Sequence, residues 1–394
     1  MSNKTRRDEY AGGFPEGFED FETLNDPRQG KYPRHYFGEI IFMALAAMIC
    51  GSEGFDDFER FAKLREKWLR KHLKLSGGVP SNDTFRRVFS SINPDEFCRC
   101  FASYIISFSK TLEHQLIAID GKTLRRSFEN SDPTTSLHLI SAWACDNQLT
   151  LGQLAVDGKS NEITAIPKLI DQLDLEGHTV SLDAMGCQKK IAQKLYVANA
   201  HYLLALKGNQ PTLHRRVEEF FSSSAHLKHA KAQGYTLNSV DIENEGHGRQ
   251  ERRVVLCTDS LEIIDKKERE SWLGLKSIIC VEAHREEKSS GRKSIQRRYY
   301  LTSHEPEAKK LQQLIRQHWA IENQCHWTLD VTFNEDQSRA RKDNAASNLA
   351  MLRKVTLSLL KQNTSIKDTM RGKRCRAALD EQTLEQLIFP QPPR

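Results

Sequence analysis

The sequence predicts a mixed α/β protein in which helices cover the faces of a mixed sheet. Three observations indicate this class. Helical patterns follow one another up to about residue 113, short apolar strands then alternate with helices as far as residue 206, and a strand-rich segment precedes the last helices. The chain has 394 residues, of which 38% are hydrophobic, so it is long enough for two or three domains with a sizeable core.

The patterns divide the chain into four consecutive parts. Residues 1–33 are polar and rich in Gly, Pro and Asp, which predicts a flexible arm. A helical N-terminal domain is expected over 34–113, and an α/β domain over 114–362 with a β-rich insertion at 211–306. Residues 363–394 are basic and end in a proline-rich run, which predicts a mobile tail.

The helical domain is expected to hold four helices, because apolar residues recur at spacings of three and four. Ser81-Asn82-Asp83 is expected to cap the third helix, and Asn93-Pro94-Asp95 is expected to start the fourth. The third carries Arg86 and Arg87, which either make a helix-turn-helix-like contact with DNA or form only a solvated face. The first two helices are expected over residues 37–50 and 55–73, and the fourth over 94–112.

From residue 115 the pattern changes to short apolar runs, which are typical of buried strands. The second and third runs are joined by Asp146-Asn147-Gln148, a connection that suits a hairpin. Three antiparallel strands followed by α/β crossovers give a mixed sheet. The strands are expected over 116–119, 137–145, 149–156, 178–182 and 201–206. One helix is expected to be capped by Asn161 or Thr164 and to run to Leu173, and another is expected over 188–200. Within the insertion, strands are expected over 252–258, 276–283 and 295–302, and helices follow over 309–328 and 344–360.

The net charge, the cysteine count and the length of the apolar runs limit which partners and cell compartments are expected for this protein. The formal net charge of +6 is mildly basic and favours a polyanionic partner only weakly. The nine cysteines are odd in number and scattered, so we expect reduced, mostly buried thiols, as in a cytoplasmic protein. Residues 1–10 lack the apolar core of a signal peptide. The longest apolar run, 40–50, is far shorter than the about 20 residues of a membrane span, so no contact with a membrane is expected.

Asp120 ends the strand at 116–119, and a basic turn follows it directly. A carboxylate at the end of a buried strand is held rigidly at the rim of the core, which suits a metal site. The dipeptide Asp120-Gly121 is also common in turns, and this stretch by itself favours a simple turn.

Two further carboxylates change that balance. Asp183 ends the fourth strand, and Glu322 lies on the helix after the insertion. In a ribonuclease-H-like sheet the first and fourth strands are neighbours, so Asp120 and Asp183 would converge at one edge and the late helix would add Glu322. Carboxylates this close raise one another's pKa unless a cation neutralises them. Their oxygens favour Mg²⁺, or alternatively Mn²⁺, and two such ions would clamp an in-line phosphoryl transfer.

Four longer motifs contain these carboxylates or adjoin them. They are Ala118-Ile119-Asp120-Gly121-Lys122-Thr123-Leu124-Arg125, Asp183-Ala184-Met185-Gly186-Cys187-Gln188-Lys189, Leu206-Lys207-Gly208-Asn209-Gln210 and His318-Trp319-Ala320-Ile321-Glu322-Asn323. They resemble the motifs of the H-repeat-associated proteins, a family of bacterial insertion-sequence transposases with a DDE catalytic triad. The resemblance covers roughly residues 25–380. It implies a ribonuclease-H-like catalytic domain with Asp120, Asp183 and Glu322 as its triad.

Several residues are candidates for contact with DNA. Many transposases of this kind carry Tyr-x-x-Arg before the glutamate and a basic residue after it, but Ile315, His318 and Leu329 stand at those places here. Basic and amide side chains near the strand ends and in the insertion are therefore the alternative candidates for contact with DNA. Each of them is also typical of a solvated turn. These candidates are Lys122, Arg125, Arg126, Lys207, Asn209 and Arg249.

Other metal sites remain open on the sequence. Glu335 and Asp336 are alternative third carboxylates on the loop after the glutamate helix. His318, Glu322 and His326 are four residues apart and could bind zinc, but the spacing is not that of the H-E-x-x-H motif.

The sequence therefore predicts a DNA transposase that acts on terminal repeats and target DNA and forms a homo-oligomer when assembled on DNA. Metal-bound Asp120, Asp183 and Glu322 would activate water to cut at element ends, and the freed 3′-hydroxyl would attack target DNA. The alternatives are a transposase-derived DNA-binding protein without transposition activity and a related metal-dependent nuclease.

Overall fold

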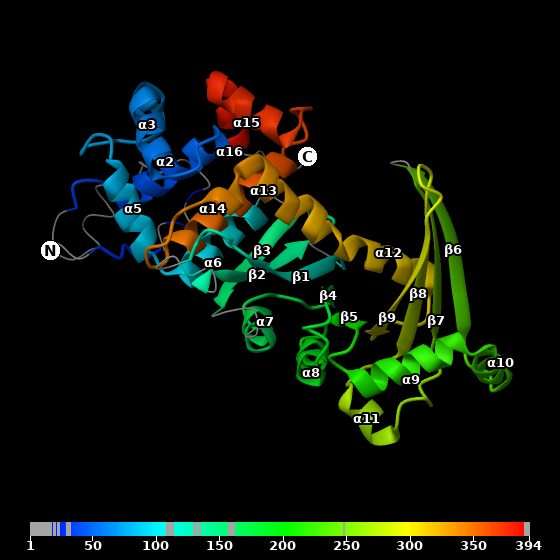
Figure 1. Ribbon diagram of the computed structural model, residues 1–394. Coiled ribbons are helices and arrows are strands. Elements are labelled where there is room, and N and C mark those ends of the chain that lie inside the picture. The colour runs from blue at the N-terminus through cyan, green and yellow to red at the C-terminus, as the bar shows by residue number, and fades with distance from the viewer. Residues whose placement is uncertain are drawn as a thin grey trace. The chain divides into compact units, whose positions relative to one another are not determined.

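The computed structural model describes residues 18, 21, 24–28, 33–107, 114–128, 132, 135–156, 162–246 and 249–389, without the side chain of Arg249 (Figure 1). Contacts group the chain into two compact units. Unit 1 comprises residues 1–112, 121–159 and 322–394, and unit 2 comprises residues 113–120 and 160–321. None of the helices in the described ranges combines the length and the apolar character that crossing a membrane requires.

The strands of the described chain are β1 (Leu116–Thr123), β2 (His138–Ala144), β3 (Leu149–Val156), β4 (Thr179–Leu182), β5 (His201–Leu206), β6 (Leu237–Gly246), β7 (Arg249–Thr258), β8 (Ser277–Glu287) and β9 (Lys293–Thr302). Their hydrogen-bonded order is β3-β2-β1-β4-β5-β9-β8-β7-β6. β4 is parallel to both β1 and β5, whereas β2 and β3, and β5 to β9, pair in antiparallel fashion. The expected mixed sheet with many helices is confirmed.

Unit 1 is mainly helical. Residues 345–360 of its longest helix are all buried, and this helix packs against β3 and against six other helices of the unit. The helices of unit 1 are α2 (Phe37–Ile49), α3 (Phe55–Leu64), α4 (Glu66–His72), α5 (Asn82–Ser91), α6 (Pro94–Ser107), α13 (Trp327–Phe333), α14 (Ala345–Gln362), α15 (Met370–Leu379) and α16 (Glu381–Ile388).

Local signals place most of these helices. Ser81 caps α5 as expected, because its side chain accepts the backbone N–H of Thr84 at 3.4 Å. The single helix expected over 55–73 is instead two, because Arg65 leaves the helical conformation at φ −105° and ψ 16°. The fourth expected helix is described as far as Ser107, and its last residues lie outside the described ranges.

The expectation of a mobile C-terminal tail is wrong for residues 363–389. Two of the basic residues that suggested it, Lys373 and Arg374, are buried, because they satisfy carbonyl groups at the ends of other helices, whereas Arg371 and Arg376 are exposed. Lys373 Nζ donates to the carbonyl of Leu360 at 2.7 Å, and Arg374 donates to that of Met48 at 3.2 Å. These bonds attach α15 to the C-terminal ends of α14 and α2.

The expected flexible arm is likewise wrong where the structure describes it. Phe18 and Phe21 are buried, and their rings lie 4.6 and 5.6 Å from that of Tyr104. Each is part of an aromatic cluster with α2 and α6. The other residues of the arm, apart from residues 24–28 and 33, lie outside the described ranges.

A charged network crosses the interior of unit 1. Lys122 Nζ lies 2.8 Å from Glu335 Oε2 and also pairs with Asp330. Glu335 is only 1% exposed, and its pKa is lowered because nearby cations outweigh the effect of burial. Lys354 is equally buried and donates to Ser141 at 2.7 Å. Such buried charges are tolerated only when they are paired.

Unit 2 surrounds β4 and β5 and continues into the insertion. Its helices are α7 (Glu162–Ile170), α8 (Lys189–Val197), α9 (Pro211–Ser222), α10 (Ser224–Ala232), α11 (Lys266–Ser271) and α12 (Ala308–His318). β6, α9 and α10 were not expected from the sequence. β6 shows no apolar alternation, since most of its residues are exposed. One face of the β6–β9 sheet packs on α12 through residues such as Val255, Tyr300 and Leu311.

α12 also reaches β4, where His318 Nδ1 and Ser181 Oγ lie 2.8 Å apart. Burial lowers the pKa of His318 to about 4, so its ring is neutral at pH 7. This contact attaches the end of α12 to the strand that leads into Asp183.

Replacing His318 with Asn should reduce the loss of stability between pH 7 and pH 5. The pKa of His318 is about 4 in the folded chain and 6.5 ordinarily, so the unfolded chain binds the extra proton in this window. At pH 5 this lowers the free energy of unfolding by about 2 kcal/mol. Asparagine keeps a polar group near the Nδ1 position but does not titrate. Urea unfolding at both pH values measures the difference.

His229→Asn is the matched control, because His229 is exposed on α10. It should keep the pH dependence of the wild type. The same pH dependence in wild type and His318→Asn would contradict the role given to His318.

Replacing Lys122 with Met should destabilise the protein by roughly 3–5 kcal/mol, because it leaves the carboxylate of Glu335 buried without its closest cation. Thermal and urea unfolding measure this change. Lys231→Met, at an exposed position of α10, should change stability by less than about 0.5 kcal/mol. Equal stability of the two variants would show that the buried pair contributes nothing.

Candidate active site

Asp120 and Asp183 directly follow the last register pair of two neighbouring parallel strands. Asp183 comes just after the end of β4, but the expected strand end at Asp120 is wrong, because β1 continues to Thr123. Ile119 of β1 is the register partner of Leu182 of β4, and the two aspartates are the next residue on each strand. Carboxyl ends of adjacent parallel strands meet at one edge of a sheet, where α/β proteins build their sites. Unit 2 therefore brings these two predicted residues together.

The loop after β4 holds the side chain of Asp183. Its Oδ1 accepts the backbone N–H groups of Met185 at 2.9 Å and Gly186 at 3.3 Å. A Cβ on Gly186 would lie 2.7 Å from the Cβ of Leu182, so only glycine allows this close approach. The sequence Asp183-Ala184-Met185-Gly186 thus fixes one carboxylate oxygen.

The loop after β5 in turn holds the loop after β4. The side-chain amide of Asn209 donates to the carbonyl of Ala184 and, at 3.4 Å, to that of Cys187. Gln210 Nε2 donates to the carbonyl of Cys187 at 3.1 Å. Asn209 was expected to contact DNA. Like Lys207 two positions before it, Asn209 is exposed, but its amide N–H groups are engaged by these carbonyls. Sequence motifs did not reveal this clamp, because they do not show which loops touch.

The electrostatic surroundings of Asp183 favour a cation. Burial raises its pKa, and the carboxylate of Glu162 raises it further, although the backbone N–H groups and Lys207 act in the opposite direction. A bound cation would remove the cost of keeping this carboxylate ionised. Glu162 begins α7 and is buried, and no sequence pattern pointed to it.

Glu322 lies in a six-residue π-helical segment, η4 (Ile321–His326), and is exposed. The helix expected over 309–328 is interrupted at this point, because α12 ends at His318 and η4 begins three residues later. Such π-helical turns are frequent at functional sites. Glu322 follows Ile321, the last residue of unit 2, directly in the chain.

Within the described ranges, no three His, Cys, Asp or Glu side chains come close enough together to hold a metal ion. This finding supports neither a zinc site at His318, Glu322 and His326 nor a preformed metal site of Asp120, Asp183 and Glu322, so the triad stays a prediction. The Nδ1 atom of His318 is instead engaged by Ser181.

The alternative third carboxylates are occupied by basic side chains. Glu335 is paired with Lys122, and Asp336 lies 3.1 Å from Arg125. Lys122 was expected to face DNA, but its side chain is only 11% exposed and lies between two carboxylates. Although burial lowers its pKa, the carboxylates of Glu335 and Asp330 raise it overall.

The other predicted DNA contacts differ in what the structure shows. Arg125 and Arg126 are exposed on the turn after β1, and Lys207 is exposed after β5. Arg249 starts β7, and its side chain lies outside the description.

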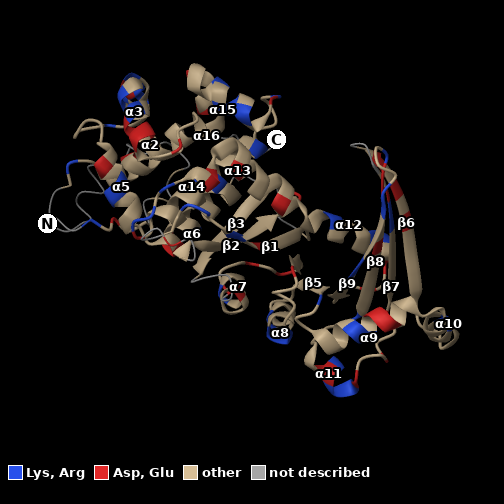
Figure 2. Ribbon diagram, viewed as in Figure 1, with Lys and Arg blue, Asp and Glu red and all other residues tan. Residues whose placement is uncertain are grey.

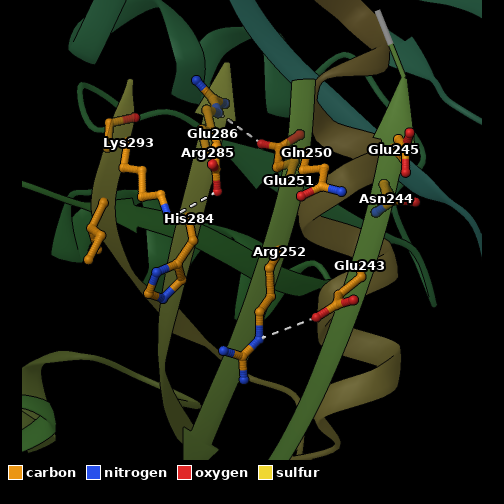
Figure 3. A pocket seen from close by; sticks show the side chains of 12 residues that line it. Glu243, Asn244, Glu245, Gln250, Glu251, Arg252, His284, Arg285, Glu286 and Lys293 are labelled. Carbon is orange, nitrogen blue, oxygen red and sulfur yellow. Dashed lines mark hydrogen bonds and ion pairs between the residues drawn. The ribbon is translucent and has the colours of Figure 1, made fainter. Parts of the chain in front are cut away.

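A cavity of about 470 Å³ lies elsewhere in unit 2, between the outer parts of β6 to β9 (Figure 3). Its walls are charged but internally paired, as Arg285 lies 2.9 Å from Glu251 and Lys293 lies 3.2 Å from Glu286. Neither Asp120 nor Asp183 lines it, so it is not the site of the aspartates.

Comparison with known proteins adds to this geometry. The sequence model of the family described as "Transposase DDE domain" matches residues 111–359, and that of the family described as "DDE_Tnp_1-associated" matches residues 18–105. "Putative transposase YncI" of Escherichia coli O157:H7 is 36% identical over 93% of this chain and 92% of its own length. "H repeat-associated putative transposase YhhI" of Escherichia coli K12 is 35% identical over 94% of this chain and 97% of its own.

Among solved structures, a piggyBac transposase synaptic complex with hairpin DNA aligns with 98% of this chain and 81% of its own. Its TM-score is 0.43 at 9% identity, a likeness too low to carry an argument. The family model and the two relatives are sufficient without it. By their match over most of its length, this chain belongs to the family of DDE transposases that includes the H repeat-associated proteins.

Proposed function

We propose that the protein is a DNA transposase that cuts DNA at element ends and joins the freed 3′-hydroxyl to target DNA. Asp120, Asp183 and Glu322 are its metal-binding catalytic residues. The observation that carries the proposal is the register of β1 and β4, which makes Asp120 and Asp183 the next residues after the last pair, Ile119 and Leu182. The family match supplies the reaction class.

The proposal includes a ribonuclease-H-like arrangement of β1 to β5. It is supported by the adjacency of β1 and β4, which is the feature that such a sheet requires to bring its two aspartates together. Glu322 completes the donor set in this proposal, because it lies in the motif His318-Trp319-Ala320-Ile321-Glu322-Asn323, which resembles the glutamate motif of the family.

The donor set suits Mg²⁺, with Mn²⁺ as a substitute. Asp120, Asp183 and Glu322 offer only carboxylate oxygens, and hard divalent cations prefer oxygen ligands. When bound, such a cation would activate water and neutralise charge on the phosphate. The protein's own part is to hold the ligands still. Backbone N–H groups orient Asp183, and Asn209 holds the loop that provides them.

Replacing Asp120 or Asp183 with Asn, or Glu322 with Gln, should lower DNA cleavage and strand transfer by about a thousandfold or more, because each loses a cation ligand. The assay combines the protein, Mg²⁺ and DNA that carries the repeats flanking the gene. Asp174→Asn and Glu270→Gln, at exposed acidic positions of unit 2, are the matched controls and should stay active.

Each other outcome has a definite meaning. Products that persist in Asp120→Asn or Asp183→Asn would refute the triad. Binding of the repeats without products, in Mg²⁺ or Mn²⁺, would favour a transposase-derived DNA-binding protein. Cleavage without strand transfer would favour a nuclease.

Replacing Asn209 with Leu should lower the cleavage rate at saturating DNA by about 10- to 100-fold, because the loop that holds Asp183 loses its clamp. The Kd for DNA, measured by fluorescence anisotropy, should stay within about twofold, since the amide is not directed at DNA. Lys207→Met is the comparison, because this neighbour is exposed and should weaken binding if it contacts a phosphate. A weaker Kd with an unchanged cleavage rate for Asn209→Leu would restore its expected role as a DNA contact.

A further inference from the structure

Exposed basic side chains gather on unit 1 in the segment between the short helix η5 (Glu335–Gln337) and α14. Arg339, Arg341 and Lys342 lie in this segment, and all three are exposed. Figure 2 shows Lys and Arg along the chain around α5 and the start of α14. Sequence patterns did not single these residues out, because no periodicity marks a loop.

One end of the segment is attached to the turn after β1. Arg341 Nε donates to the carbonyl of Arg126 at 3.1 Å. The guanidinium of Arg341 also lies over the ring of Phe128, 4.4 Å from its centre, which restricts its motion. Arg341 is therefore held against the backbone of Arg126, in the turn that follows Thr123, the last residue of β1.

The other end is attached to α5. The backbone N–H of Asn344 donates to the carbonyl of Ser90 at 3.1 Å. Arg86 is the main cause of a lowered pKa of Asp83, and the charge of Lys342 contributes to it. Lys342 is therefore within electrostatic reach of Asp83, the first-turn residue of α5 that pairs with Arg86 and Arg87.

The charges on this surface do not cancel. Asp83 is paired with Arg86 and Arg87, and Asp336 with Arg125. The segment also carries one exposed carboxylate, Asp343, directly after Lys342. Over the described ranges, no ion pair joins a carboxylate to the remaining bases, which are Arg126, Arg339, Arg341 and Lys342, so the surface keeps an excess of positive charge. Uncompensated exposed cations at fixed positions are the electrostatic feature that a phosphate backbone requires.

We propose that Arg126, Arg339, Arg341 and Lys342 form a basic surface that binds the phosphate backbone of duplex DNA between the end of β1 and α5. This inference rests on the proposed function, since it assigns the DNA of that reaction to a surface of unit 1. The surface positions the duplex without reading its sequence, because guanidinium and ammonium groups on a loop contact phosphates. It also gives α5, with Arg86 and Arg87, access to the same duplex.

The test measures binding of a labelled terminal-repeat duplex to full-length protein at several salt concentrations, in the Asp120→Asn background so that no cleavage occurs. The triple variant R339Q/R341Q/K342Q should weaken binding about 10- to 100-fold at 0.15 M salt. It should also reduce the slope of log affinity against log salt by about 2 to 3, at about 0.9 for each lost phosphate contact.

The matched control is K67Q/K367Q/R371Q, which removes the same charge from exposed positions of unit 1 elsewhere. It should keep the wild-type slope. The pair R339Q/K342Q leaves the contacts of Arg341 intact and should lose about two units of slope if folding is unaffected. Equal salt slopes for the triple variant and the control would refute the proposal that this surface binds the phosphate backbone.

This result is independent of the proposed chemistry. If the wild type cleaves DNA but the triple variant keeps the wild-type salt slope, the proposed DNA-binding role of the surface is wrong and the proposed function stands. The surface stands and the proposed chemistry fails if the wild type gives no products but the triple variant alone loses slope.

Discussion

The parallel pairing of β1 with β4 is the constraint on which the proposed chemistry depends. These strands are distant in sequence, and their register makes Asp120 and Asp183 the next residues after the paired Ile119 and Leu182. A shift of one residue would turn one aspartate to the other face of the sheet. The loops that follow maintain the arrangement, because Asn209 holds the backbone that orients Asp183.

Two acidic side chains of this protein, Glu335 and Asp183, lie in opposite electrostatic surroundings. Glu335 is buried deeply but lies beside Lys122, with Lys354 and Arg353 also lowering its pKa. Asp183 is in the opposite situation, since burial and Glu162 raise its pKa. One carboxylate is therefore neutralised by the protein itself, whereas the other is best neutralised by an added cation. This contrast separates a structural ion pair from a candidate metal ligand more clearly than sequence position does.

The sequence predicted much of the fold where local signals suffice. The bounds of β3 and β5 and the cap at Ser81 agree with the structure, because apolar runs and capping residues act over a few positions. Prediction from the sequence failed where contacts between residues far apart in the chain determine the structure. Lys373 and Arg374 suggest a mobile tail until the carbonyls that they satisfy are known.

The same limit applies to the site. Asp120 and Asp183 were predicted at strand ends, but the pairing of Lys122 and the clamp by Asn209 are contacts between distant segments. The division into four consecutive parts stays a prediction, and the contacts group the chain differently, with residues 322–394 beside the N-terminal helices in unit 1.

Replacing each aspartate with cysteine, a softer ligand, tests directly whether Asp120 and Asp183 bind the catalytic cation. Asp120→Cys and Asp183→Cys should each abolish cleavage in Mg²⁺ and recover part of it in Mn²⁺, because a thiolate binds hard Mg²⁺ poorly. Glu335→Cys should show no such recovery, since Glu335 is paired with Lys122 inside the protein. If the two aspartates bind the cation, DNA cleavage recovers in Mn²⁺ in both aspartate variants and does not recover in Glu335→Cys. Full activity of either aspartate variant in Mg²⁺ would contradict it.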